Sequence, residues 1–183
     1  MILIRIANNL VFYGVGLKSN DLGVNPYLSF LISAIVELIS ILLTSPIISR
    51  FGRKKPYIAC LLVASSSCLS FYFIDNVIVG VVLAMIGKFA ISSSYCIIHL
   101  YSSEIFPTTM RGSCQGSCSM MARLGSILAP KIIALDVVYK GLPFLVFGMA
   151  ALFSALTSII LPETLNKKLP ENLQEAQKID INP

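Results

Sequence analysis

The sequence is poor in charged residues. Asp, Glu, Lys and Arg make up 13% of its 183 residues, whereas soluble globular domains contain about 25%. Hydrophobic residues account for 56% of the chain, and the mean hydropathy is +0.82. This composition excludes an ordinary soluble domain and predicts an integral membrane protein. Tryptophan is also absent, so Tyr and Phe must supply any aromatic belt at the membrane surfaces.

Other absences exclude classes of function. The five cysteines form no C-x-x-C pair and lie in or beside apolar stretches, so we interpret them as packing residues rather than metal ligands. No nucleophile–base set, phosphate-binding loop or cluster of metal ligands is present, which argues against an enzyme and against a bound cofactor or metal. The net charge of +5 is clustered in short segments, which argues against a nucleic-acid-binding surface.

Apolar stretches fill most of the chain. A membrane-spanning helix needs about 20 mainly apolar residues. Five stretches approach or exceed this length, at 26–49, 57–74, 77–101, 112–135 and 143–161. A sixth stretch, at 2–17, is shorter and contains Arg5, Asn8 and Asn9. This stretch is either an interfacial helix or a sixth span whose polar side expects a protein neighbour, and we favour the second interpretation.

Basic residues lie in alternate loops. Four of the fourteen basic residues fall within 50–55, and the tail adds Lys167, Lys168 and Lys178, whereas the opposite loops show no positive excess. Because positive charge accumulates on the cytoplasmic side, both termini are expected in the cytoplasm, which requires an even number of spans. The sequence therefore predicts an all-α integral membrane protein, with a six-helix transmembrane lobe at 1–162 and a cytoplasmic tail at 163–183.

Three charges lie deep within the predicted spans. Glu37, Lys88 and Arg123 stand about halfway along the second, fourth and fifth stretches. A charge near the bilayer midplane costs at least about 3 kcal/mol on insertion scales, and such residues usually face a cavity or a partner. We predict a polar pathway that these residues line. The alternative is an ion-pair cluster with a purely structural role.

Three short motifs connect the chain to a known family. Residues 50–56 read R-F-G-R-K-K-P, residues 104–111 read E-I-F-P-T-T-M-R, and residues 161–164 read L-P-E-T. These segments resemble signatures of the major facilitator superfamily: the basic loop between the second and third helices of each half, and the motifs after the tenth and twelfth helices. Their order and spacing make the resemblance specific.

Finer features narrow the resemblance. Phe12-Tyr13-Gly14 and the segments 36–37, 121–130 and 161–176 resemble the organic cation, anion and carnitine transporters of the solute carrier family 22 type. The resemblance covers only the second half of such a transporter, helices seven to twelve. It implies a lobe that works with a missing N-terminal six-helix lobe in the plasma membrane. The two lobes would move a small organic ion by alternating access.

The resemblance also suggests a substrate class. Cation-transporting relatives usually carry an aspartate where this chain has Arg123, so the set Glu37, Lys88 and Arg123 has a net charge of +1 instead of −1. At an effective dielectric constant of about 20, a charge 4 Å away is worth about 4 kcal/mol. An organic anion, or a zwitterion such as carnitine, is therefore favoured over a cation. Ile41 replaces a second cation of anion-transporting relatives, which favours a zwitterion over a dianion.

We assign roles to the predicted binding residues accordingly. Arg123 is expected to bind a carboxylate or sulfonate, because its planar guanidinium can donate two parallel hydrogen bonds. Glu37 and Lys88 are expected to pair and to hold two helices in register. Tyr13 is expected to face the substrate. For Tyr95, ordinary helix packing is the favoured role.

The resemblance implies a second site at the cytoplasmic ends of the helices. There, charged groups would close the inner gate in one state and separate in the other. His99, near the same end, is expected to be solvated or hydrogen-bonded rather than proton-coupling. The predicted gate residues are Arg50, Arg53, Glu104, Arg111 and Glu163.

Two other functions remain open from the sequence. Sugar-porter-like facilitators share the three motifs, although a neutral sugar gives no reason for Arg123 at mid-membrane depth. A non-transporting membrane subunit derived from half a transporter is the other alternative.

Overall fold

A computed structural model of the protein describes residues 1–19, 26–72, 77–106, 110–137 and 141–159. Within these ranges every regular element is helical, and each predicted apolar stretch falls on one helix. The elements are α1 (Ile2–Ser19), α2 (Pro26–Phe51), α3 (Lys54–Tyr72), α4 (Val77–Ile105), α5 (Arg111–Ala134), the short 3₁₀ helix η1 (Leu135–Val137) and α6 (Leu142–Ser158).

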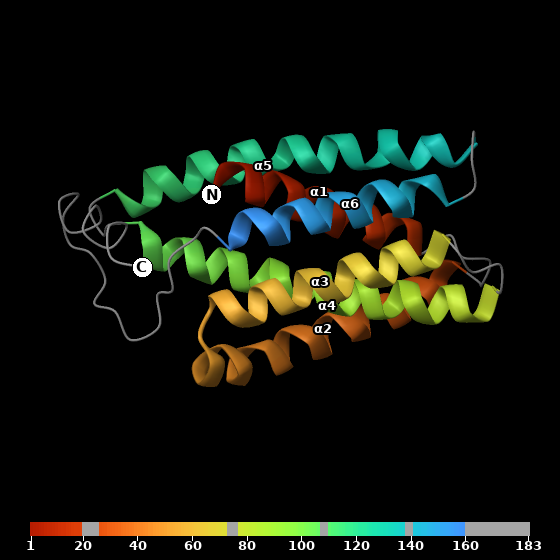
Figure 1. The fold of residues 1–183 in the computed structure, drawn as a ribbon, viewed down its shortest axis with the longest axis horizontal. Helices are drawn as coiled ribbons and strands as arrows, with labels where there is room; N and C mark the ends of the chain where they lie inside the picture. The colour runs from red at the N-terminus through yellow and green to blue at the C-terminus, as the bar shows by residue number, and fades with distance from the viewer. Residues whose placement is uncertain (20–25, 73–76, 107–109, 138–140, 160–183) are drawn as a thin grey trace.

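The helices run side by side along the long axis of the molecule (Figure 1). Helix α1 packs against α5, α6 and α4, while α4 packs against α1, α2 and α3. The order α5–α1–α4–α2 therefore forms one layer, with α5 and α2 on opposite edges (Figure 1), and the packed pair α3 and α6 covers one face of it. Because α3 and α6 cover one face of the layer, the polar sides of α1 and α4 face its other, uncovered side.

The apolar core lies where α1, α3, α4 and α6 meet. Its fully buried side chains come from all four helices, and between helices in a bilayer such side chains stabilise by close packing rather than by leaving water. The helices approach closely because of small residues: a Cβ atom at Gly14 would lie 2.3 Å from Cζ of Phe147. Core residues with no exposed area include Val11, Leu61, Ile91, Phe144 and Ala151.

Three of the described helices are long and apolar enough to cross a bilayer by themselves: Tyr27–Phe51, Ile78–Ile105 and Arg111–Val137. Helix α6 is apolar but shorter. Helix α1 contains Arg5, Asn8 and Asn9, which lower its hydropathy. The all-helical class is confirmed for the described residues, whereas six spans stay a prediction.

The connection between α2 and α3 is short, because one residue, Gly52, reverses the chain direction. Its φ of 86° lies in the left-handed region, which glycine adopts without steric cost and which commonly ends helices. Arg53 follows directly and α3 begins at Lys54. This turn brings the basic loop to the same end of the molecule as the end of α4 and the start of α5 (Figure 1).

Candidate functional site

A polar cavity of about 270 Å³ lies between α1, α4 and α5. It forms because α5 lies directly on α1: a Cβ atom at Gly125 would be 2.3 Å from the carbonyl oxygen of Ile6. Only glycine permits this approach, which places the polar residues of α5 near Gly125 beside the polar residues of α1. The lining residues are Arg5, Asn8, Asn9, Tyr13, Tyr95, Ile98, His99, Ser119, Ala122, Arg123 and Ser126.

Arg5 is buried in the wall of this cavity, with 3% of its area exposed. Its Nη1 donates to Oγ of Ser119 at 3.1 Å, and its Nη2 donates to Oγ of Ser102 at 2.5 Å. Nη2 also lies 3.4 Å from Nδ1 of His99, which therefore acts as the acceptor. Arg5 thus links α4 to α5 through neutral partners, and its Nε has no hydrogen-bond partner.

Two asparagines extend the polar wall along α1. Asn9 donates from Nδ2 to the carbonyl oxygen of Ala122 at 2.9 Å, which fixes α1 against α5. Asn8 accepts a hydrogen bond from Oγ of Ser94 at 2.7 Å, but its buried Nδ2 has no partner. Buried polar atoms are nearly always hydrogen-bonded, so an unpaired donor at a cavity wall indicates space for an acceptor.

The charges at the cavity are all positive. Arg5 and Arg123 line it, no Asp or Glu does, and the three ion pairs found among the described residues include neither arginine. An isolated charge in a low-dielectric site is strongly unfavourable unless an opposite charge compensates it. The cavity can therefore hold an anion.

Aromatic rings form the remaining wall. Phe12 stacks on Tyr95 with ring centroids 4.4 Å apart, and Tyr95 meets His99 edge to face at 4.7 Å. Tyr13 contacts Phe12 at 5.4 Å and is exposed. Tyr95 therefore packs as expected and also lines the cavity, which the sequence did not indicate.

Glu37 and Lys88 lie apart from this cavity. Nζ of Lys88 is 3.9 Å from Oε2 of Glu37 and donates to Oγ of Ser33. These contacts join α4 to α2, in the arrangement that the predicted pair requires. Of the three deep charges, only Arg123 lines the cavity, together with Tyr13.

The structure brings two of the predicted gate residues together. Arg53 donates to Oε1 of Glu104 from Nη2 at 2.7 Å and from Nε at 3.0 Å, which joins the α2–α3 loop to α4. Arg50 is exposed. Arg111 has two buried nitrogen atoms, Nε and Nη2, without a hydrogen-bond partner in the described part of the chain. Glu163 and the predicted tail at 163–183 lie outside the described residues.

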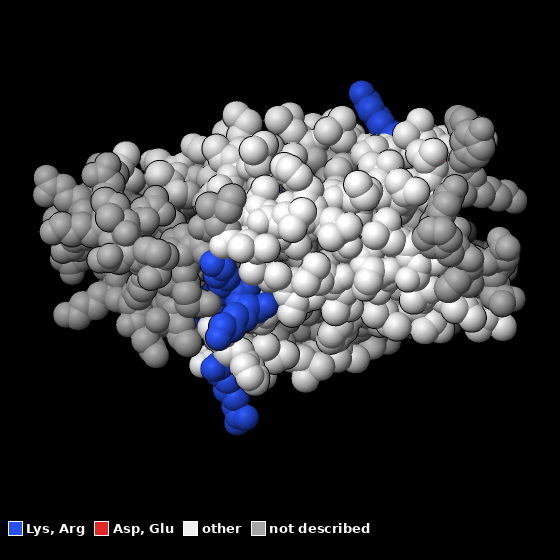
Figure 2. All heavy atoms as spheres, in the orientation of Figure 1, with Lys and Arg blue, Asp and Glu red and all other residues white. Residues whose placement is uncertain are grey.

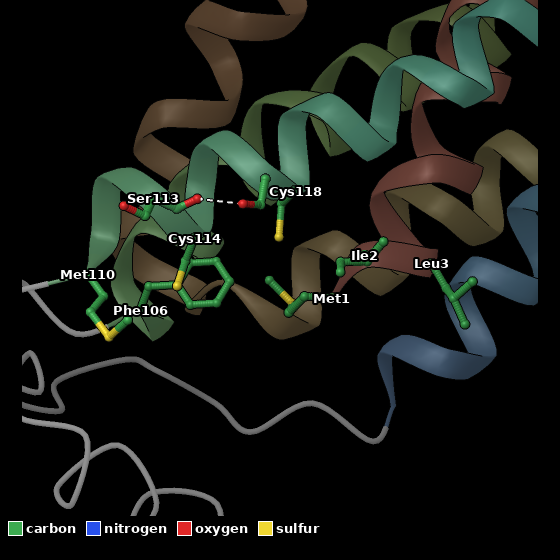
Figure 3. Close-up of a pocket in the computed structure, with 9 residues that line it drawn as sticks. Met1, Ile2, Leu3, Phe106, Met110, Ser113, Cys114 and Cys118 are labelled. Carbon is green, nitrogen blue, oxygen red and sulfur yellow. Dashed lines mark hydrogen bonds between the residues drawn. The ribbon is translucent and has the colours of Figure 1, made fainter.

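A second concavity, of about 670 Å³, is almost entirely apolar (Figure 3). It lies where the beginnings of α1 and α5 face the end of α4, and the few polar groups in it come from one side of α5. Ser117 there donates to the carbonyl oxygen of Ser113 at 2.9 Å and is thus already satisfied. The lining residues are Met1, Ile2, Leu3, Phe106, Met110, Ser113, Cys114, Ser117 and Cys118.

Sequence reasoning did not identify Arg5, Asn8, Ser119 or His99 as residues of the binding site. A signal was present: Arg5, Asn9 and Tyr13 recur every four residues and so share one face of a helix. The serines that complete the wall give no such signal, because serine is common in α2, α3, α4 and α5 alike. Among the described residues no three His, Cys, Asp or Glu side chains are grouped so that they could hold a metal ion.

Comparison with known proteins places this sequence in a family. The profile of the Major Facilitator Superfamily matches residues 1–180. The chain therefore belongs to the Major Facilitator Superfamily, as its three motifs predicted.

Curated relatives narrow the similarity. The chain is 37% identical over 178 residues to "Organic cation transporter protein" of Drosophila melanogaster, a match that covers 96% of this chain and 32% of the relative. It is 38% identical to "Solute carrier family 22 member 15" of Xenopus tropicalis, covering 91% of this chain and 33% of the relative. It is 36% identical to "Solute carrier family 22 member 16" of Homo sapiens, covering 97% and 31%.

Two consequences follow from these matches. The chain spans about a third of the length of the curated relatives that it matches. The names of these relatives describe transporters and solute carriers rather than enzymes. They confirm the prediction from the sequence that the protein is not an enzyme.

Proposed function

We propose that this chain is the C-terminal six-helix lobe of a transporter that moves a small organic anion, or a zwitterion such as carnitine, by alternating access. One observation carries the proposal: among the described residues, Arg5 and Arg123 line the polar cavity and no acidic residue does. Secondary transporters bind substrate near the midplane, where their two lobes meet. Arg123 is exposed in the isolated lobe, as a substrate ligand at such an interface needs to be.

The name of one relative refers to organic cations, and the charges of this cavity oppose a cation. At an effective dielectric constant of about 20, each like charge 4 Å from the substrate costs about 4 kcal/mol. A sugar-porter-like function is also less favourable, since a neutral substrate leaves both arginines uncompensated. A non-transporting subunit would give no reason for unpaired donors at a cavity wall.

The proposed partner of this lobe is the missing N-terminal six-helix lobe. The exposed side of α5 fits such a contact, because Cβ atoms added at Gly112 and Gly116 would meet nothing within 4 Å. The apolar concavity beside them (Figure 3) offers area for a helix of that lobe. Small residues of this kind allow close contact between helices in a bilayer.

We further propose that both termini face the cytoplasm, in the plasma membrane. The positive-inside rule supports this orientation, because Arg50, Arg53, Lys54 and Lys55 lie in the α2–α3 connection or in the helix ends beside it. On the face drawn in Figure 2, the Lys and Arg residues in view gather mainly near that connection, and no Asp or Glu of the described residues is in view.

At this end the ion pair of Arg53 and Glu104 forms part of the proposed inner gate. Partly exposed pairs contribute only about 0–1 kcal/mol, which suits a contact that must break in every transport cycle. Arg111 has two nitrogen atoms without a partner in the described ranges, so it has donors for an acid such as Glu163. Arg50 completes the proposed set.

The decisive experiment reverses one charge in the complete transporter that contains this lobe. Arg123→Asp should lower the uptake of labelled benzoate and carnitine into proteoliposomes by at least about a hundredfold, since an attraction of about 4 kcal/mol becomes a repulsion. Lys131→Asp is the matched control, because Lys131 is an exposed cation of α5 outside the cavity. Normal benzoate uptake by Arg123→Asp, or uptake of tetramethylammonium alone by the wild type, contradicts the proposal.

A further inference from the structure

Arg5 is a buried cation without a counter-ion, and neither the three-residue set predicted from sequence nor the comparisons assign it a role. All three of its partners are neutral, namely Ser102, Ser119 and His99. Because Arg5 donates toward Nδ1 of His99, the imidazole has to be neutral there as well. A hydrogen-bonding role between helices would be filled by a neutral side chain, so the positive charge itself calls for an explanation.

The position of Arg5 relative to Arg123 supplies that explanation. The guanidinium of Arg5 contacts Ser119, which lies one helical turn before Arg123 on α5. Four residues correspond to about 6 Å along a helix axis. The two cations therefore line one cavity at different depths, with Arg5 nearer the end of α4.

The unpaired atoms of the same wall are donors. Nε of Arg5 and Nδ2 of Asn8 are both buried without a partner among the described residues, and both side chains line the cavity. Asn8 is only 1% exposed. Two unsatisfied N–H groups beside an uncompensated cation match a ligand that presents acceptor atoms and negative charge, such as a carboxylate.

We propose that Arg5 and Asn8 form a second anionic subsite, so that the cavity binds a small organic anion with two negative groups, one at Arg5 and one at Arg123. This inference rests on the proposed anion-binding function and narrows its substrate class from a single carboxylate to a dicarboxylate. The cavity volume of about 270 Å³ lies just below the usual range of ligand sites, about 300–1,000 Å³, and restricts the substrate to a small molecule.

Two probes of equal length separate the subsites. Adipate has a carboxylate at each end of four methylene groups, and adipamate is the same chain with one carboxylate replaced by a neutral amide. The complete transporter in proteoliposomes should show a KM at least about tenfold lower for adipate than for adipamate. Arg5→Gln should remove that difference by raising the KM for adipate, with less than a twofold change for adipamate.

Further variants distinguish recognition from folding. Arg5→Lys keeps the charge and should retain most of the preference for adipate. Ser119→Asp places a carboxylate beside Arg5 without removing it, so it should lower adipate uptake at least tenfold more than adipamate uptake, even if Arg5→Gln fails to fold. Lys131→Gln, which removes an exposed cation outside the cavity, should change neither KM.

The outcomes also separate this inference from the proposed function. Equal loss of adipate and adipamate uptake in Arg5→Gln and Ser119→Asp, or no loss in either, overturns the second subsite. If adipamate uptake still depends on Arg123 in that case, the proposed function stands. Absence of wild-type uptake of both probes and of benzoate overturns the proposed function and this inference together.

Discussion

On the α2–α4 side of the lobe, Lys88 lies 3.9 Å from Glu37 and donates to Ser33, whereas on the α1–α5 side Arg5 and Arg123 have no acidic partner among the described residues. Both sides carry deep charges in apolar surroundings, where a cation costs about 3 kcal/mol or more. The lobe itself supplies the compensating charge on one side only. The difference teaches that depth alone does not identify a binding residue, because a compensated charge can serve structure while an uncompensated one requires a ligand or partner.

The strongest way to break the α1–α5 side is to separate its two helices. Gly125→Ala places a Cβ atom 2.3 Å from the carbonyl oxygen of Ile6, and a backbone atom cannot rotate away as a side chain can. Overpacking costs about 1–3 kcal/mol or more, so we expect a loss of about 3 kcal/mol and of anion uptake. Thermal unfolding of the purified complete transporter measures the first effect and proteoliposome uptake the second.

The control for this change lies on α1. Gly16→Ala meets nothing within 4 Å and replaces a poor helix former by a good one, a gain of up to about 1 kcal/mol. Equal stability of the two variants would show that α5 does not lie on α1 as described.

A smaller loss of stability is expected on the α2–α4 side, where Lys88 and Glu37 compensate each other's charge. Lys88→Met leaves the carboxylate of Glu37, which is 36% exposed, without its counter-ion. Breaking a fully buried pair costs about 3–5 kcal/mol, and partial exposure reduces this to about 1–2 kcal/mol. The loss of stability is measured by thermal unfolding, and the double variant Lys88→Met with Glu37→Leu should recover most of it.

The substrate preference is the sharper readout for this pair. Uptake of benzoate relative to tetramethylammonium should remain within about twofold of wild type in both variants, since neither residue lines the cavity. A large change in that ratio would place Glu37 and Lys88 in the binding site and erase the contrast between the two sides.

The smallest effect on stability is expected at the end of the helices, where Arg53 bonds to Glu104. Glu104→Gln should cost about 0–1 kcal/mol, yet slow the initial rate of uptake severalfold with an unchanged KM, because the pair belongs to the proposed gate and does not line the cavity. Lys55→Gln, which removes an exposed charge from the first turn of α3, is the control and should leave the rate unchanged. A changed KM in Glu104→Gln argues for a binding role instead.

The helices themselves were predictable because long apolar runs leave few alternatives in a membrane. The stretch predicted at 26–49 became α2 at Pro26–Phe51, and that predicted at 77–101 became α4 at Val77–Ile105. The short motifs around Gly52 and Glu104 predicted the family, and the ion pair of Arg53 with Glu104 joins two of them in space.

The site was predicted only in part. Arg123 and Tyr13 stood out by their depth or by the motif around them, and both line the cavity. Arg5 did not, because it lies near the start of a short stretch, where a basic residue is ordinarily an interfacial anchor. Its burial arises from Ser102 and Ser119 on two other helices, which no local pattern reveals.

The sequence by itself determined that this protein is a helical membrane protein of the Major Facilitator Superfamily, because composition, apolar length and short loop motifs are local properties. Only the tertiary structure decided which charges are compensated and which share a cavity. Those relations depend on distances between helices, and these are set by contacts such as Gly125 against Ile6. From the sequence, Arg5 was only part of a polar helix side that expects a protein neighbour. The same packing buries Arg5 in the wall of the cavity that Arg123 also lines.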